Sequence, residues 1–331
     1  MYALAAYIST DIPSPTEVDR RLCVLAAEQR GFARRCEEIL RNATTVEKPS
    51  EIEGTVEYDR FFGVCRVDRP GADLMAAQIA ATSAVVLTEL SRTVLAADEL
   101  VAVLSTLGDL TARFPVAAAN LAAPRTEDEV RADEPAAASV EDRALYRWVI
   151  GHHLFNLASV FCIEAVNRAR RSALDGDAAG TAAALVQAAG RLRATTAAMW
   201  FAGAFPASAY LGHVRPAMAA ASGSEGGFSG TQNLDYHRLR RAIDGLRESL
   251  PTMPVAGAPN VRAAHAVFTE TEIEDVEHHV LIAAAKVGGI EPSLLTSASL
   301  ALLPVDLERA PAVEVLRDMA ALRRANRDRR P

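Results

Sequence analysis

The chain has almost no lysine and lacks three common catalytic motifs. Only Lys48 and Lys286 occur among 35 basic residues. A P-loop needs a lysine directly after its glycines, and neither position provides one, so P-loop chemistry is excluded. Gly-x-Gly-x-x-Gly and a surrounding βαβ pattern are absent, which argues against a Rossmann domain. Gly-x-Ser-x-Gly is absent too: the stretch 227–230, Gly-Phe-Ser-Gly, only partly resembles it, so serine hydrolase chemistry is not supported.

Cysteine is scarce, and so are targeting signals. The four cysteines are scattered and none has Cys-x-x-Cys spacing, which excludes a disulfide framework, a structural zinc site and a heme attached through Cys-x-x-Cys-His. The N-terminal residues carry no basic stretch of a signal peptide. We expect no apolar stretch of membrane-spanning length, since the best candidate, 197–212, is short and contains Gly203 and Pro206. A cytoplasmic protein without a membrane partner is predicted.

Composition and charge favour a globular protein that does not bind nucleic acid. The 331 residues are 50% hydrophobic and 23% charged, and the formal net charge is −7. Such a balance is typical of a packed core, and an acidic chain is a poor binder of nucleic acid. Alanine and leucine at helical spacing predict an all-α bundle. Helices are expected at 14–42, 72–91, 93–106, 108–122, 140–173, 178–203, 233–250 and 261–288.

Three parts of the sequence are predicted not to be helical. The segment 56–67, which contains two phenylalanines, is interpreted as extended. Residues 125–138 are acidic and contain proline, which favours a loop or linker between an N-terminal region, 1–124, and a C-terminal region, 139–331, in one integrated domain. Glycines at 223–230 predict an interhelical loop that lets the backbone approach a ligand, although an ordinary turn with an Asn or Asp cap explains them equally well.

Histidines are the most informative side chains. All seven lie at position 152 or later, and His is the commonest ligand of metals and heme iron. On helix 261–288 an apolar stripe includes Ile273, Val276 and Val280; it places His279 beside the stripe and His278 away from it. On helix 233–250, His237 and Arg241 share a face that packing does not require. A single helical His is more often an ordinary surface or core residue than a ligand.

Two alternatives use these residues differently. Asp275-x-x-His278 approximates half of the ligand motif of carboxylate-bridged diiron proteins, but no true Glu-x-x-His occurs. A non-heme iron enzyme is therefore one alternative. The other is a helical binding protein without catalysis, whose alanine-rich helices pack against a partner. A homodimer is compatible with every interpretation.

The residues around the Gly-rich turn resemble a family. Val214-Arg215-Pro216-Ala217-Met218, the Gly-Phe-Ser-Gly stretch at 227–230 and Asp235-Tyr236-His237 are similar to segments of the heme-dependent aromatic oxygenases. These include tryptophan and indoleamine dioxygenases and the peroxide-using tyrosine hydroxylases, and the last branch is the most similar. A second likeness is His279 followed by an apolar run and Gly288, which resembles the axial-His helix of tryptophan dioxygenases. The Gly-Thr-Gly-Gly stretch of those enzymes is absent here.

This resemblance implies a heme b enzyme of specialised metabolism that inserts oxygen into an aromatic amino acid or a derivative. It leaves the oxidant, oxygen or peroxide, open. His237 is implied as the iron ligand, with His279 as the second choice. The remaining residues that it nominates are Arg241 beside the heme, Ser229, Tyr236 and His213 in catalysis, and Arg215, Arg238, Trp200 and Phe228 around the substrate.

Overall fold

The computed structural model describes residues 52, 54–67, 70–93, 95–113, 139–223, 227–228, 230–287 and a few positions between 314 and 325. Within this part every regular element is helical, which confirms the all-α prediction. Contacts divide the chain into two compact units. Unit 1 contains residues 62–154 and 200–205, and unit 2 contains 50–61, 155–199 and 206–331. The expected helix at 14–42 and linker at 125–138 lie outside the described residues, so the predicted domain boundaries remain a prediction.

Unit 1 is built from α5 (Ala72–Leu90), α6 (Ala97–Ala112) and the first part of α9 (Val140–Leu174). The expectation of two helices at 93–106 and 108–122 is wrong over the described residues, where a single helix is found. Glu99 fixes its start by accepting a 2.9 Å hydrogen bond from the N–H of Ala96. Leu104 and Leu107, both buried, continue one apolar face through the expected break.

Helices α5 and α9 are both long and apolar enough to cross a membrane. The prediction that no stretch reaches that length is therefore wrong for these two. Their most apolar windows are 61% and 72% buried inside the protein. Burial of this extent is what core helices of a packed protein show, because their apolar faces already contact other helices.

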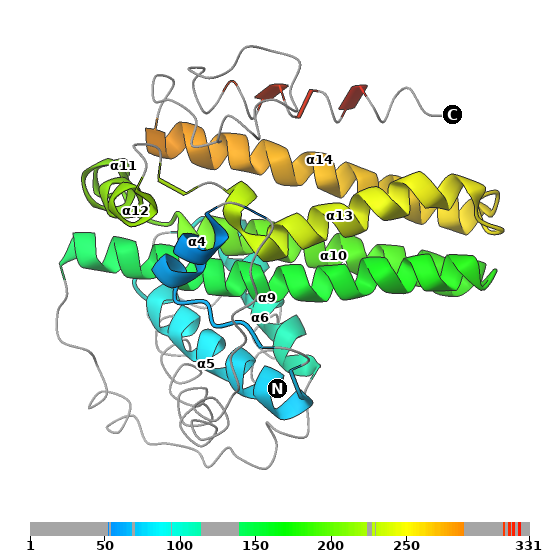
Figure 1. The fold of residues 1–331 in the computed structure, drawn as a ribbon, viewed down its shortest axis with the longest axis horizontal. Coiled ribbons are helices and arrows are strands. Elements are labelled where there is room, and N and C mark those ends of the chain that lie inside the picture. The colour runs from blue at the N-terminus through cyan, green and yellow to red at the C-terminus, as the bar shows by residue number, and fades with distance from the viewer. Residues whose placement is uncertain are drawn as a thin grey trace. The chain divides into compact units, whose positions relative to one another are not determined.

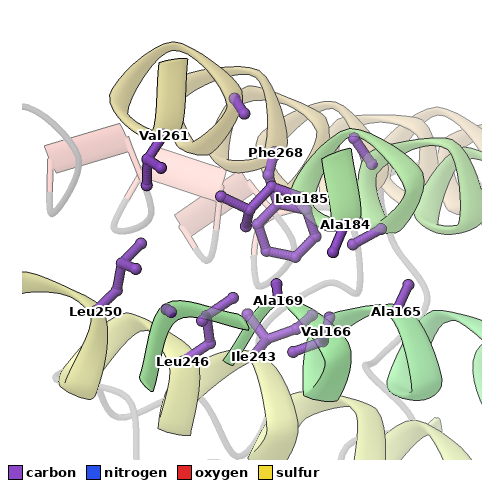
Figure 2. Packing of buried hydrophobic residues seen from close by; sticks show 14 of the residues in the cluster. Ala165, Val166, Ala169, Ala184, Leu185, Ile243, Leu246, Leu250, Val261 and Phe268 are labelled. Atoms are coloured by element: carbon purple, nitrogen blue, oxygen red, sulfur yellow. The ribbon is translucent and has the colours of Figure 1, made fainter. Parts of the chain in front are cut away.

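Unit 2 contains a four-helix bundle. It consists of the second part of α9, α10 (Ala178–Ala202), α13 (Leu234–Ser249) and α14 (Pro259–Val287), which run side by side in Figure 1. Leu239, Ile243 and Leu246 are each 1% exposed, as expected from the apolar face of α13. All three belong to one hydrophobic core with Phe268 and Val261 of α14, and Figure 2 shows Ile243 and Leu246 in it. Alanines at 165, 169, 184 and 188 let α9 and α10 approach closely in the same core.

The segment expected to be extended is in fact helix α4 (Thr55–Phe62). Gly54, at φ 79°, precedes it in a conformation that favours glycine. Tyr58 and Phe62, one turn apart, are 2% and 1% exposed. Burying both aromatic rings requires helical spacing, and this packing outweighs the preference of aromatic residues for strands.

A series of short helices joins α10 to α13. It comprises α11 (Ala207–Ala209), a π-helix (Tyr210–Val214) and α12 (Arg215–Ser222). The Gly-rich interhelical loop follows: Gly223 ends α12 at φ 67°, and Gly227 has φ 77°. A 3-10 turn (Gly230–Gln232) then leads into α13, and another (Leu250–Thr252) follows α13. The 3-10 turn at Gly230–Gln232 ends directly before Asn233, the first residue before α13.

Candidate functional site

Polar side chains lie in the interior of the four-helix bundle. We call this set the polar layer: the buried Asn156 and Ser159 of α9, Thr195 and Thr196 of α10, Asn233 before α13, Glu272 and Asp275 of α14, and the partly buried Arg240 of α13. Hydrogen bonds join the helices in pairs, Asn156 to Asn233, Thr196 to Asp275 and Arg240 to Glu272. Since an apolar bundle core needs no such groups, the layer is the natural place to look for function.

Asn233 organises one side of the polar layer. Its Oδ1 accepts hydrogen bonds from the N–H groups of Asp235 (2.9 Å) and Tyr236 (3.2 Å), which caps α13. Its Nδ2 therefore faces the other way and donates to the hydroxyl of Tyr58 (2.9 Å) and to Oδ1 of Asn156 (2.7 Å). Because the cap fixes which end of Asn233 donates, it also fixes Asn156, whose carbonyl must point toward Asn233.

Two hydrogen-bond donors of the layer have no partner within the described part of the chain. They are Nδ2 of Asn156, which points away from Asn233, and Oγ of Ser159. Asn156 is 8% exposed and Ser159 is 0% exposed. Buried donors are nearly always satisfied in native proteins, so each of these two calls for a partner that the described residues do not supply.

Aromatic rings lie directly beside the amides. Phe228 packs against Tyr58 edge to face, with centroids 5.7 Å apart, and against Phe61 at 5.4 Å. Phe155 and Tyr236 lie 6.1 Å apart between α9 and α13. Tyr58 thus connects the aromatic rings with the amides, because its ring contacts Phe228 and its hydroxyl accepts a hydrogen bond from Asn233. Polar donors beside aromatic walls form an environment suited to a ring that carries polar substituents.

The carboxylates of the layer have hydrogen-bond partners within the bundle. Glu272, 3% exposed, accepts from Arg240 at 2.9 Å and from Arg247 at 2.8 Å. Burial opposes the charge of Arg240, yet Tyr236, Glu272 and Asp244 raise its pKa above the ordinary value. Asp275 accepts a 2.7 Å hydrogen bond from Thr196. Glu272 is thus paired with two guanidinium groups, whereas Asp275 is held by a neutral hydroxyl.

Cys162 lies close to these carboxylates. Its pKa is raised by burial and then by Asp275 and Glu272. The thiol therefore stays protonated and is no nucleophile.

His279 and His237 differ in orientation. His279 stands two helical turns after Glu272 and three after Phe268, so it lies on the face of α14 that meets the bundle. Its Nδ1–H donates to the carbonyl of Asp275 at 2.7 Å, and the Asp275 carboxylate lies 3.9 Å away. Nε2 is left with its lone pair available. His237 points away from the buried face of α13; burial and then Arg241 lower its pKa, which favours the neutral ring.

The structure also describes several other residues predicted from the sequence. Tyr236 and Phe228 form the aromatic contacts described above. The exposed Arg238 lies on the first turn of α13, 3.8 Å from Asp235, and Arg241 is one turn beyond His237. Ser229 lies outside the described residues.

Three further predicted residues, His213, Arg215 and Trp200, remain predictions. In the described part of the chain no hydrogen bond or ion pair joins His213 or Arg215 to Tyr236 or His237. Arg215 instead lies near Tyr210, whose pKa burial raises to about 12. Trp200 belongs to unit 1, so its place near the substrate remains a prediction.

Asp275 and His278, the predicted half-motif for non-heme iron, have other hydrogen-bond partners in the structure. Asp275 faces Thr196, while Nδ1 of His278 donates to the carbonyl of Glu274 at 2.7 Å. Among the residues that the structure describes, no group of three or more His, Cys, Asp or Glu side chains is placed to hold a metal ion. A carboxylate-bridged centre needs such a group.

Comparison with known proteins places this chain in a family. The sequence matches the family described as SfmD 3-methyl-L-tyrosine peroxygenase over residues 9–266. The chain belongs to the SfmD 3-methyl-L-tyrosine peroxygenase family. One relative, the 3-methyl-L-tyrosine peroxygenase of Streptomyces lavendulae, is 28% identical over 253 residues, which are 76% of this chain and 67% of the relative. A crystal structure of reduced SfmD, soaked with sodium hydrosulfite, is similar at a TM-score of 0.47 and 24% identity, covering 80% of this chain and 93% of that one.

The span that matches the SfmD family contains most of the candidate site. It includes Asn156, Ser159, Asn233 and His237, whereas Glu272, Asp275 and His279 follow its end at residue 266. Sequence reasoning missed Tyr58, Asn156, Ser159 and Asn233. The position of Asn233 just before an apolar-periodic helix is a recognisable cap signal. Nothing in the local sequence shows that its second donor group reaches Tyr58, a residue 175 positions earlier.

Proposed function

We propose that this chain is a heme-dependent peroxygenase that inserts oxygen into a tyrosine-like aromatic amino acid. The observation that carries the proposal is the family match across residues 9–266, because the family description and the Streptomyces relative both name a peroxygenase of 3-methyl-L-tyrosine. The polar layer supports it: aromatic rings beside unpartnered donors suit a substituted aromatic substrate.

We further propose His279 as the iron ligand. Histidines that bind metal usually donate their second ring N–H to a carbonyl or carboxylate, which fixes the tautomer and the ring orientation. Asp275 does this for His279, so the lone pair of Nε2 is presented by a ring that cannot turn freely. His237 has the neutral ring that binding requires and lies within the matched span, but no hydrogen bond orients it in the described part of the chain. His279 is therefore preferred, and His237 is the alternative.

The proposed chemistry divides between the cofactor and the chain. When bound, heme supplies the redox-active iron that activates peroxide. Asp275 holds a proton on Nδ1 of His279, and Thr196 holds Asp275 in place. Phe155 and Tyr236 exclude water from the donors of α9. Arg238 and Arg215 are the candidate partners of a substrate carboxylate, for which a guanidinium provides two parallel donors.

The proposal is tested by the fate of the oxygen atom. Full-length protein loaded with heme is given 3-methyl-L-tyrosine and 18O-labelled hydrogen peroxide, and the product is analysed by mass spectrometry. We expect a product heavier by one 18O atom and none when peroxide is omitted. A heme-loaded protein that leaves both this amino acid and L-tyrosine unchanged would contradict the proposal.

A further inference from the structure

Asn156 and Ser159 place two unpartnered donors on the same side of α9. Residues three apart on a helix are neighbours, so the side chains of Asn156 and Ser159 lie next to each other on α9. Ser159 also lies one turn from Phe155, which contacts Tyr236, and one turn from Cys162, which donates to the carbonyl of Ala188 in α10 at 3.6 Å. The pair therefore faces the interior between α10 and α13 and not the solvent.

Neither donor is satisfied by the partner that its side chain would ordinarily find nearby. The orientation of Asn156 is fixed by Asn233, so its amide cannot turn to satisfy Nδ2 without bringing two donor groups together. A serine within a helix ordinarily donates to the carbonyl four residues earlier, as Thr181 and Ser249 do here. Ser159 makes no such bond among the described residues although it is 0% exposed. Two acceptor positions are thus required at one place.

The electrostatics of the layer define the acceptor. Asp275 and Glu272 lie close enough to Cys162 to raise its pKa, and Cys162 is the neighbour of Ser159 on α9. Arg240 and Arg247 are engaged, since both donate to Glu272, and Arg191 is a further cation near Cys162. A substrate carboxylate here would meet the buried carboxylates of Asp275 and Glu272. A neutral oxygen that accepts hydrogen bonds from an amide N–H and a hydroxyl is not repelled by these carboxylates.

We infer that Asn156 and Ser159 bind the phenolic oxygen of the substrate and so orient its ring beside Phe155 and Tyr236. The inference rests on the proposed function. It adds that the phenolic end of the substrate is the end that enters the polar layer. It assigns the two residues a positioning role: holding the ring hydroxyl sets which ring carbon is presented for oxygen insertion.

Ser159→Ala isolates the donor, because it removes only the hydroxyl and breaks no bond of the described chain. A matched control is Ser83→Ala on α5, since Ser83 is 1% exposed and its Oγ is also unpartnered. Both substitutions remove a buried unsatisfied hydroxyl, so each is expected to raise the melting temperature by roughly 1–3 °C. A Ser159→Ala variant that melts below wild type would show a structural hydrogen bond and overturn the inference.

Binding is measured by titration calorimetry with two probes, 3-methyl-L-tyrosine and 3-methyl-L-phenylalanine, which differ in the phenolic oxygen alone. Wild type and Ser83→Ala should bind the tyrosine analogue more tightly than the phenylalanine analogue. Ser159→Ala should weaken binding of the tyrosine analogue roughly three- to tenfold and leave the other probe unaffected. An unchanged preference in Ser159→Ala overturns this inference and leaves the proposed function standing. A wild type that binds neither probe contradicts the proposed substrate class, and the inference with it.

Discussion

Thr196 donates a 2.7 Å hydrogen bond to Asp275 in the interior of the four-helix bundle, joining α10 to α14. Asp275 is 6% exposed, and Thr195 reaches it only at 3.5 Å. The same aspartate accepts the ring N–H of His279 through its main-chain carbonyl. One residue therefore connects the stability of the bundle with the orientation of the proposed iron ligand.

Replacing Thr196 by valine keeps the side-chain shape and removes this donor. We expect the free energy of unfolding to fall by about 1.5–3 kcal/mol, because a buried carboxylate loses its principal hydrogen bond. Thr106→Val is the control: Thr106 is similarly buried but donates only to the carbonyl of Ala102 within its own helix. Urea unfolding followed by circular dichroism compares the two. Equal losses of unfolding free energy in the two variants would show that the hydrogen bond from Thr196 to Asp275 stabilises the protein no more than a bond within one helix.

Arg240→Met removes one of the two arginines that hold Glu272. Because Glu272 is buried and Arg247 remains, a loss of about 1–3 kcal/mol in unfolding free energy is expected. The matched control is Arg168→Met, which breaks a pair with Glu164 whose side chains are 41% and 46% exposed. That change should cost less than about 1 kcal/mol. If Arg168→Met proved as costly as Arg240→Met, the buried pair would not be the stronger one.

The pKa of His237 should be measurably low. Burial, and then the charge of Arg241, lower it below its ordinary value of 6.5. The unfolded chain then takes up a proton more readily than the folded one. The contribution of His237 to stability is consequently complete above about pH 6.5 and is lost as the pH falls from there toward the folded-state pKa.

An NMR titration of the imidazole signals measures this pKa directly. Arg241→Gln should raise the pKa of His237, since a positive charge is removed. Arg238→Gln removes the same charge one residue after His237 and, because Arg238 pairs with Asp235, should leave the titration where it is. A wild-type pKa at or above 6.5 would contradict the expected desolvation.

Helical periodicity was sufficient to predict most of the bundle. Helices α9, α10, α13 and α14 lie within a few residues of the ranges expected from apolar spacing, and the inward face of α13 was identified correctly. Helix α4 was missed because its short sequence carries aromatic residues with a strand preference, and its helical form depends on burying Tyr58 and Phe62. Local propensity contains no information about such partners.

The face of α14 was harder to predict for a related reason. The apolar stripe of Ile273, Val276 and Val280 is buried as expected. The helix also contacts α11 and the π-helix, so it buries more than one face. Its bundle-facing line continues from Phe268 through Glu272 and Asp275, where buried carboxylates take the place of apolar residues. A hydrophobicity pattern treats these two as surface positions, although the same stripe correctly predicts that His279 lies beside the buried face.

The most direct test of the account is a heme titration of the full-length protein and two matched variants, followed by absorption spectroscopy. Wild type should give a Soret band near about 400 nm that saturates at roughly one heme per chain. His279→Ala should lose this band while keeping its helical circular dichroism, and added imidazole should restore it. His237→Ala, the same substitution on the outward face of α13, should retain it. A wild type without a Soret band would contradict the proposed cofactor, and a band lost in His237→Ala but kept in His279→Ala would contradict the assignment of His279 as the iron ligand.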